Sequence, residues 1–133
     1  MSLSNLETVF DHLHDRASGD LGAVAAQLDP AVVHQGVVAD MVCSGRDAVV
    51  ARMRAAQGGD RLSGGIDRIE LVDAGDRVIV GLHGDRFRQV PWLTGGQLFI
   101  VYTLRDGQIA RMDDHRSRAE AFTAAGIEPA DWV

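Results

Sequence analysis

The spacing of apolar residues divides the chain into a helix-forming first half and a strand-forming second half. After Ser4, apolar residues recur every three or four positions, which predicts an amphipathic helix with the stripe Leu6, Val9, Phe10, Leu13 and Ala17. A second helix is predicted after Asp20, and Asp29-Pro30 ends it because proline cannot continue a helix. A third is predicted from Gly45 to about Ala56.

Beyond Gly65 the period changes to two, which is typical of strands. Strands are predicted over 66–72, 77–87, 97–104 and 109–115, and a shorter one runs from Ala31 to Val37. Asp106-Gly107 tolerates the positive φ angles of a type I′ turn and predicts a hairpin. Ser117-Arg118-Ala119-Glu120 has the form of a capping box, so it predicts a last short helix that stops near Gly126.

This order predicts an α+β fold, in which helices lie on one face of a curved antiparallel sheet and a pocket opens at its wide end. We expect a single domain over residues 1–133. The net charge of −6 argues against nucleic acid as a partner, because phosphate binding needs a basic surface. No apolar run is long enough to cross a membrane, and the N-terminus lacks the layout of a secretory signal. With one cysteine, Cys43, the expected location is the cytoplasm.

Several short phrases appear in an order that is similar to a known family. They are 18–21 (SGDL), 28–33 (LDPAVV), 45–49 (GRDAV), 74–80 (AGDRVIV), 104–109 (LRDGQI) and 118–121 (RAEA). They cover nearly the whole chain and resemble the SnoaL-like branch of the nuclear-transport-factor-2-like (NTF2-like) superfamily. The resemblance implies a cone-shaped, cystatin-like α+β barrel, usually a homodimer, with an apolar pocket. Members include polyketide cyclases, ketosteroid isomerases and limonene epoxide hydrolases, so the fold does not settle the function.

Alternation along the last strand places Met112 and Asp114 on one face, and Ile109, Arg111 and Asp113 on the other. The resemblance implies that Met112 and Asp114 face into the cone, where Asp114 matches an acidic residue of the epoxide hydrolases. The alternative for Asp114 is a structural role, in which it ties the strand end to an arginine or to backbone donors.

Three more positions follow from the same resemblance. His34 matches a pocket tyrosine of the epoxide hydrolases, and its near-neutral ordinary pKa makes it the best available base. Tyr102 is expected to polarise an oxygen, with a packed core aromatic as the alternative. Gly36 and Ile100 lie where the isomerases keep an aspartate base and an oxyanion donor, which argues against steroid isomerisation.

The remaining pocket candidates are Leu82, Trp92 and His12. The long middle strand has Leu82 and Gly84 where the epoxide hydrolases keep an arginine and an aspartate, unless a bulge turns His83 and Asp85 inward. Trp92 is a candidate lid over the pocket. The isomerases keep a pocket tyrosine near the position of His12, although helical spacing predicts a solvated face for it.

No metal-ligand or nucleotide-binding motif occurs, so no metal and no cofactor are expected. Three functions stay open. The first is a cofactor-independent isomerase, cyclase or dehydratase that acts on a small apolar molecule and uses His34 and Asp114 as acid and base. The second is a non-catalytic module that binds such a molecule. The third is a dimeric scaffold, with a homodimer expected through the outer sheet face that carries Ile109 and Arg111.

Overall fold

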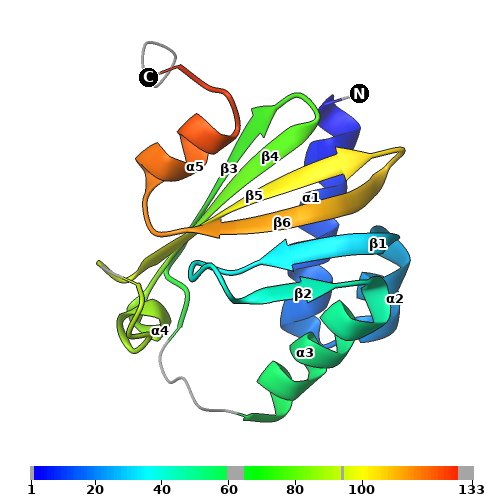
Figure 1. The fold of residues 1–133 in the computed structure, drawn as a ribbon, viewed down its shortest axis with the longest axis horizontal. Coiled ribbons are helices and arrows are strands. Elements are labelled where there is room, and N and C mark those ends of the chain that lie inside the picture. Colours follow the sequence, from blue (N-terminus) through cyan, green and yellow to red (C-terminus); the bar gives the residue numbers. More distant parts are fainter. Residues whose placement is uncertain (1, 60–64, 94, 129–133) are drawn as a thin grey trace.

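A curved six-stranded sheet forms the middle of the molecule, in the order β2-β1-β6-β5-β4-β3 (Figure 1). The computed structural model describes residues 2–59, 65–93 and 95–128. In these ranges the helices are α1 (Ser2–Ser18), α2 (Leu21–Gln27), α3 (Arg46–Gly59), α4 (Asp85–Arg88) and α5 (Arg118–Ala124). The strands are β1 (Leu28–Gln35), β2 (Val42–Ser44), β3 (Arg68–Ala74), β4 (Arg77–His83), β5 (Gln97–Arg105) and β6 (Gln108–His115).

The predicted four-stranded meander is confirmed, because β3, β4, β5 and β6 pair antiparallel in sequence order. The β5–β6 hairpin turns at Asp106 and Gly107, whose φ angles of 54° and 78° fit the predicted turn. The sheet is nevertheless mixed, since β1 runs parallel to β6 and pairs antiparallel with β2 on its other side. It is not closed, and β2 and β3 form its two edges.

The helices cover both faces of the sheet, not one face as predicted. The inner face packs against α1, α2 and α3, and its core includes Val9, Val24, Val49 and Tyr102. The outer face carries a second, smaller core, in which Phe122 of α5 joins Phe99 of β5. Figure 1 shows α5 apart from α1, α2 and α3, at the end of the sheet where the meander strands converge. The sequence pattern missed this division because α5 is short.

Helix starts follow the predicted caps closely. Ser117 is the N-cap of α5 and its hydroxyl accepts a hydrogen bond from the Glu120 backbone N–H. The Asp20 carboxylate caps α2 in the same way. The first helix begins at Ser2, two residues before the predicted start. The predicted strand 77–87 was too long, because β4 ends at His83 and α4 follows Gly84. At Gly84 a Cβ would lie 2.1 Å from the Gly65 carbonyl oxygen, so the backbone passes too close for any side chain.

A β-bulge in β6 corrects one predicted orientation. The pairing shifts between Thr103↔Arg111 and Leu104↔Ile109, which leaves Ala110 as an extra residue. The extra residue reverses the alternation, so that Ile109 is fully buried in the inner core and not on the outer face. Arg111 keeps the outer orientation and its Nε donates to Asp113 at 2.9 Å.

Candidate functional site

His34 and Asp114 meet on the inner face because of the parallel pairing of β1 and β6. His34 lies beside Met112 in the register, and Asp114 is two residues farther along β6. The His34 Nε2 atom is 3.1 Å from Asp114 Oδ2, and the two side chains are 24% and 15% exposed. The pair is therefore reachable from solvent, and no arginine among the described residues pairs with Asp114. The other carboxylate oxygen, Asp114 Oδ1, is buried without a hydrogen-bond partner among the described residues.

The hydrogen bond fixes how His34 can act. A carboxylate accepts, so the proton of the neutral imidazole lies on Nε2 and the lone pair lies on Nδ1. An aspartate that orients a histidine in this way also stabilises the imidazolium that forms when Nδ1 takes a proton. The pair therefore has the geometry of a general base with its orienting group.

Tyr102 on β5 and Asp114 on β6 are diagonal neighbours across the two strands, because Tyr102 pairs with Met112 and Ile100 pairs with Asp114. Its side chain is fully buried. Burial raises the pKa of Tyr102 to about 12, which the nearby Arg16 guanidinium opposes and the Asp114 carboxylate reinforces. No well-formed hydrogen bond reaches its hydroxyl from the described residues. The hydroxyl is thus a protonated donor available to an oxygen.

His12 is fully buried, which corrects the expected solvated face. The inward stripe of α1 is rotated from the predicted one, so that Val9 is buried while Phe10 is 58% exposed. Burial, together with the charge of Arg16, lowers the pKa of His12 to about 3 against the hydrogen bond from Gln27. Its ring meets that of Tyr102 edge-on, with centroids 5.5 Å apart. His12 is therefore a neutral polar group inside the cone.

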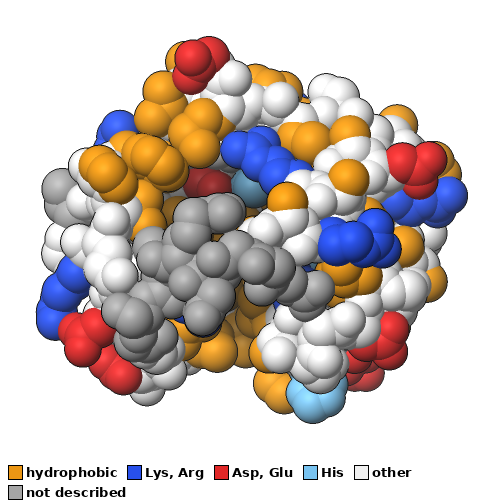
Figure 2. All heavy atoms as spheres, turned by 90° about the horizontal axis from the view of Figure 1, so that it is seen from below, with side chains coloured by type: hydrophobic (Ala, Val, Ile, Leu, Met, Phe, Trp, Pro, Cys, Tyr) orange, Lys and Arg blue, Asp and Glu red, His pale blue; other side chains and the backbone are white. Residues whose placement is uncertain are grey.

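The interior between these polar groups is filled by apolar side chains. Met112, Ile100 and Leu82 are 2%, 5% and 9% exposed, and all three belong to the inner core. Met112 occupies the centre, between His34 on β1 and Tyr102 on β5. Figure 2 shows one face of the molecule, where a recess has an acidic and a histidine side chain within it; hydrophobic side chains border the recess on the left and a basic side chain lies above it. Trp92 is 41% exposed, and its carbonyl oxygen accepts a hydrogen bond from Arg116.

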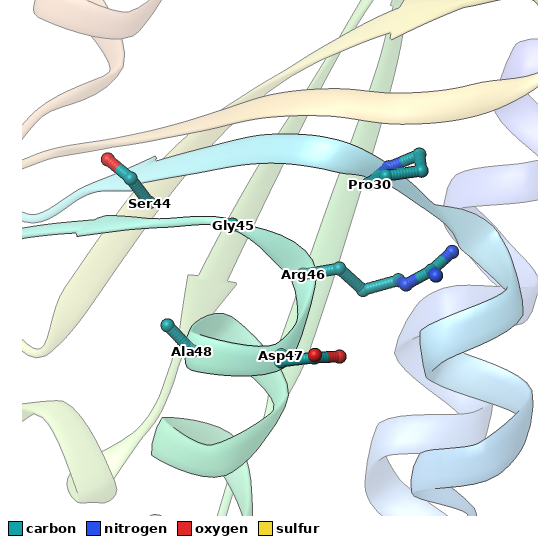
Figure 3. Close-up of a pocket in the computed structure, with 6 residues that line it drawn as sticks. All are labelled: Pro30, Ser44, Gly45, Arg46, Asp47 and Ala48. Carbon is teal, nitrogen blue, oxygen red and sulfur yellow. The ribbon is translucent and has the colours of Figure 1, made fainter.

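Two surface crevices of the described residues lie away from the His34–Asp114 pair. One, of about 380 Å³, lies where β2 leads into α3 and includes Pro30, Ser44 and Arg46. Figure 3 shows the Arg46 and Asp47 side chains pointing the same way. The other, of about 320 Å³, lies between α1 and β3 and includes Phe10 and Leu71.

The middle strand keeps the regular register, without the bulge that would turn His83 inward. Leu82 is in the inner core, whereas His83 meets Phe99 edge-on at 5.4 Å on the outer face. At Gly36, a Cβ would lie only 2.7 Å from Met41 Cβ, so the present backbone has no room for a side chain there. The inner face therefore has neither the arginine and aspartate that the resemblance implies for the middle strand of the epoxide hydrolases, nor the aspartate of the isomerases at position 36.

The contacts that Gln27 makes with His12 and Asp15 were not predicted from the sequence. The Gln27 carbonyl oxygen is 3.3 Å from His12 Nδ1, and the Gln27 amide nitrogen donates to Asp15 Oδ2 at 2.7 Å. Arg16 follows His12 by one helical turn, and this spacing was the available signal. The Gln27 contact depends on how α2 packs on α1, which spacing within one helix does not reveal.

A separate polar cluster lies on the outer face under α5. Glu70 Oε2 is 2.5 Å from His83 Nε2, and Glu70 Oε1 accepts from Arg118 at 2.6 Å. Arg118 also lies over the ring of Phe99. His115 is on this face as well, and its buried Nε2 has no partner among the described residues.

Within the ranges that the structure describes, no three histidine, cysteine or acidic side chains gather in a way that could hold a metal ion. The helices in those ranges are also too short or too polar to cross a membrane.

No family profile and no curated protein sequence matches the chain. Solved structures do match. An NTF2-like protein from Burkholderia xenovorans has a TM-score of 0.69 at 15% identity, covering 94% of this chain and 98% of that one. The chain has the NTF2-like fold.

Two further NTF2-like structures carry names of activities. A proposed polyketide cyclase from Sinorhizobium meliloti has a TM-score of 0.64 at 20% identity, covering 86% of this chain and 99% of that one. A proposed ketosteroid isomerase from Kribbella flavida has a TM-score of 0.66 at 12% identity, covering 86% of this chain and 78% of that one. The resemblance inferred from the sequence is confirmed at the level of the NTF2-like fold. Identities this low do not show that the chain shares the activity of either protein.

Proposed function

We propose that the protein is a cofactor-independent enzyme that moves a proton next to the carbonyl group of a small apolar molecule. The observation that carries the proposal is the His34–Asp114 hydrogen bond on a partly exposed part of the inner face. His34 Nδ1 removes a proton from the carbon beside the carbonyl, and the electron pair of that C–H bond moves to form an enolate. Where a C=C bond is conjugated with the enolate, return of the proton from His34 to the far carbon of that system gives an isomer with a shifted double bond. Where the enolate attacks a second carbonyl, a ring closes and the His34 imidazolium returns the proton to the new alkoxide.

Tyr102 supplies the second half of the chemistry. As the bond electrons move, negative charge develops on the carbonyl oxygen, and a hydroxyl donor in a dry interior stabilises that charge more than water does. Its pKa of about 12 keeps the hydroxyl protonated at neutral pH, so it stays a donor throughout. Asp114 holds the imidazole in place, as the orienting acid of a catalytic histidine does.

The substrate takes the space that Met112 fills. Methionine is unbranched and has several rotatable bonds, so it leaves and refills a space more readily than a branched side chain. Met112 lies between the two polar partners, and its displacement exposes His34 and Tyr102 to the same molecule. The mostly apolar surroundings, including Ile100 and Leu82, favour an apolar substrate.

The test is hydrogen exchange at the carbon beside a carbonyl. The protein is incubated in heavy water with tetralone, carvone or androstenedione, and deuterium uptake is followed by mass spectrometry. We expect exchange with at least one ketone, and roughly a 100-fold loss in His34→Gln. His14→Gln, on the exposed side of α1, is the matched control. Exchange equal to that of buffer with every ketone, or full exchange in His34→Gln, would contradict the proposal.

The closed interior favours a second function, a non-catalytic dimeric scaffold. Tyr102 and Met112 are almost fully excluded from solvent, as expected of a core whose task is to hold a surface in shape. In that case the protein sediments as a dimer in ultracentrifugation and catalyses no exchange with any ketone. Dimerisation together with exchange would favour the enzyme.

A further inference from the structure

Three buried polar atoms of the inner face lack a well-formed hydrogen bond in the described part of the chain, although the Arg16 side chain lies near one of them, the Tyr102 hydroxyl. They are His12 Nε2 on α1, the Tyr102 hydroxyl on β5 and Asp114 Oδ1 on β6. Buried polar atoms in folded proteins nearly always have partners, because leaving one unpaired is unfavourable. Three such atoms on one face, from three elements, indicate that a ligand supplies the partners.

The neighbours of His12 decide which kind of partner its Nε2 needs. The Gln27 amide nitrogen donates to Asp15 Oδ2, and this bond turns the Gln27 carbonyl oxygen toward His12. The carbonyl oxygen only accepts, so the His12 proton lies on Nδ1 and Nε2 presents a lone pair. Burial holds the pKa of His12 at about 3, so Nε2 stays unprotonated at neutral pH. Nε2 therefore needs a ligand atom that donates a hydrogen bond.

We propose that His12 is a specificity-determining residue that accepts a hydrogen bond from a hydroxyl group of the substrate. The inference rests on the proposed function, because the ligand that reaches His12 is the one that displaces Met112. Tyr102 needs an acceptor at the same time, and a carbonyl oxygen fits it. A hydroxylated ketone matches both requirements, whereas a plain hydrocarbon ketone leaves His12 unpaired.

The protonation state of His12 also limits its role in the reaction. Loss of water from a hydroxy ketone needs a proton donor at the departing hydroxyl, and a neutral imidazole that accepts from that hydroxyl cannot donate to it. His12 is therefore not the proton donor for loss of the hydroxyl that it binds. Isomerisation and ring closure, which keep that hydroxyl, need no such donor.

The first test measures the tautomer of His12 by nitrogen NMR of the ligand-free protein. The expected spectrum shows a proton on Nδ1 and an unbonded lone pair on Nε2. A proton on Nε2, or a hydrogen bond to Nε2 that disappears in Tyr102→Phe, would overturn the inference. This measurement involves no turnover, so its outcome is independent of whether His34 acts as a base.

The second test compares the binding of tetralone with that of its ring-hydroxylated isomers by calorimetry. We expect at least one hydroxytetralone to bind roughly threefold to tenfold tighter than tetralone, the size of one neutral hydrogen bond. His12→Phe should remove the difference while keeping the edge-on contact with Tyr102. His14→Phe, the same change at an exposed site on α1, should keep it.

A third variant covers the case in which His12→Phe does not fold. Gln27→Met removes the carbonyl that fixes the tautomer, so the hydroxyl preference should weaken. Equal binding of all tetralones, no binding of any, or a preference that survives both variants would overturn the inference. A hydroxyl preference without exchange in any ketone would support His12 and contradict the proposed proton transfer, so the two failures are distinguishable.

Discussion

The two faces of the sheet use polar residues in opposite ways. On the outer face, both carboxylate oxygens of Glu70 have partners, His83 at 2.5 Å and Arg118 at 2.6 Å. Among the residues that the structure describes, the outer face leaves one buried polar atom, His115 Nε2, without a well-formed hydrogen bond, whereas the inner face leaves three, on His12, Tyr102 and Asp114. Polar groups that satisfy one another hold elements together, and polar groups left unsatisfied are available to a ligand. The outer cluster fastens α5 to the sheet, whereas the inner set has the composition of a site.

The largest expected effect is on turnover and comes from the inner face. Asp114→Asn removes the charge that stabilises the His34 imidazolium, so deuterium exchange should fall by roughly 100-fold or more. Stability in urea should change by less than about 1 kcal/mol, because one oxygen of Asp114 is already unpaired. Asp113→Asn is the matched control, since Asp113 is adjacent but pairs with Arg111 on the outer face. A large loss of stability in Asp114→Asn would mark the residue as structural.

The second effect is on stability and comes from the outer face. Partial burial opposes ionisation of Glu70, but the hydrogen bonds and charges of His83 and Arg118 outweigh it and lower its pKa. Glu70→Gln should therefore reduce the free energy of unfolding by about 2 kcal/mol, measured by urea denaturation at neutral pH. Exchange activity should be unchanged. If Glu70→Gln abolished exchange while the protein stayed folded, the division between the two faces would be wrong. Glu120→Gln, on the exposed side of α5, is the control.

The third effect is a dependence of stability on pH. The pKa of His12 is about 3 in the folded protein and 6.5 in the unfolded chain, so between these values the unfolded state binds more protons. Stability is full above pH 6.5 and falls as the pH drops, by about 2 kcal/mol at pH 5. Glu70, whose pKa is lowered from 4.5, contributes only at more acidic pH. Denaturation measured at several pH values should show this fall in stability in the wild type and not in His12→Phe.

The smallest expected effect is a change in stability that has opposite signs on the two faces. Tyr102→Phe deletes a buried hydroxyl without a well-formed hydrogen bond, so stability should stay the same or rise by up to about 1 kcal/mol. Removal of a polar group from the outer cluster lowers stability instead. A Tyr102→Phe protein that melts several degrees lower would mean that the hydroxyl is bonded in solution.

Much of the fold was predictable because it follows from local chemistry. The Asp106-Gly107 turn, the Ser117 cap and the period of two in β3 to β6 all act between neighbouring residues. The β1–β6 pairing was not predictable in this way, because it joins strands separated by about half of the chain. The bulge at Ala110 was also missed, and with it the burial of Ile109, since nothing in that short stretch departs from alternation.

The site was predictable only in part. The resemblance named His34, Asp114 and Tyr102, and the structure brings them around Met112, although their roles stay predictions. His12 was placed on a solvated surface because the predicted apolar stripe of α1 included Phe10, which is 58% exposed in the structure. A histidine carries no hydrophobic signal of its own, so only the packing of α2 on α1 reveals that it is inside.

The tight contact between Gly36 and Met41 limits how this chain can be re-engineered. An aspartate at position 36, the base position of the isomerases, would need a rebuilt turn, because even its Cβ would lie 2.7 Å from Met41 Cβ. A library that varies position 36 alone keeps this close approach to Met41. Screens for new activities in this scaffold should vary position 36 and the turn around Met41 together.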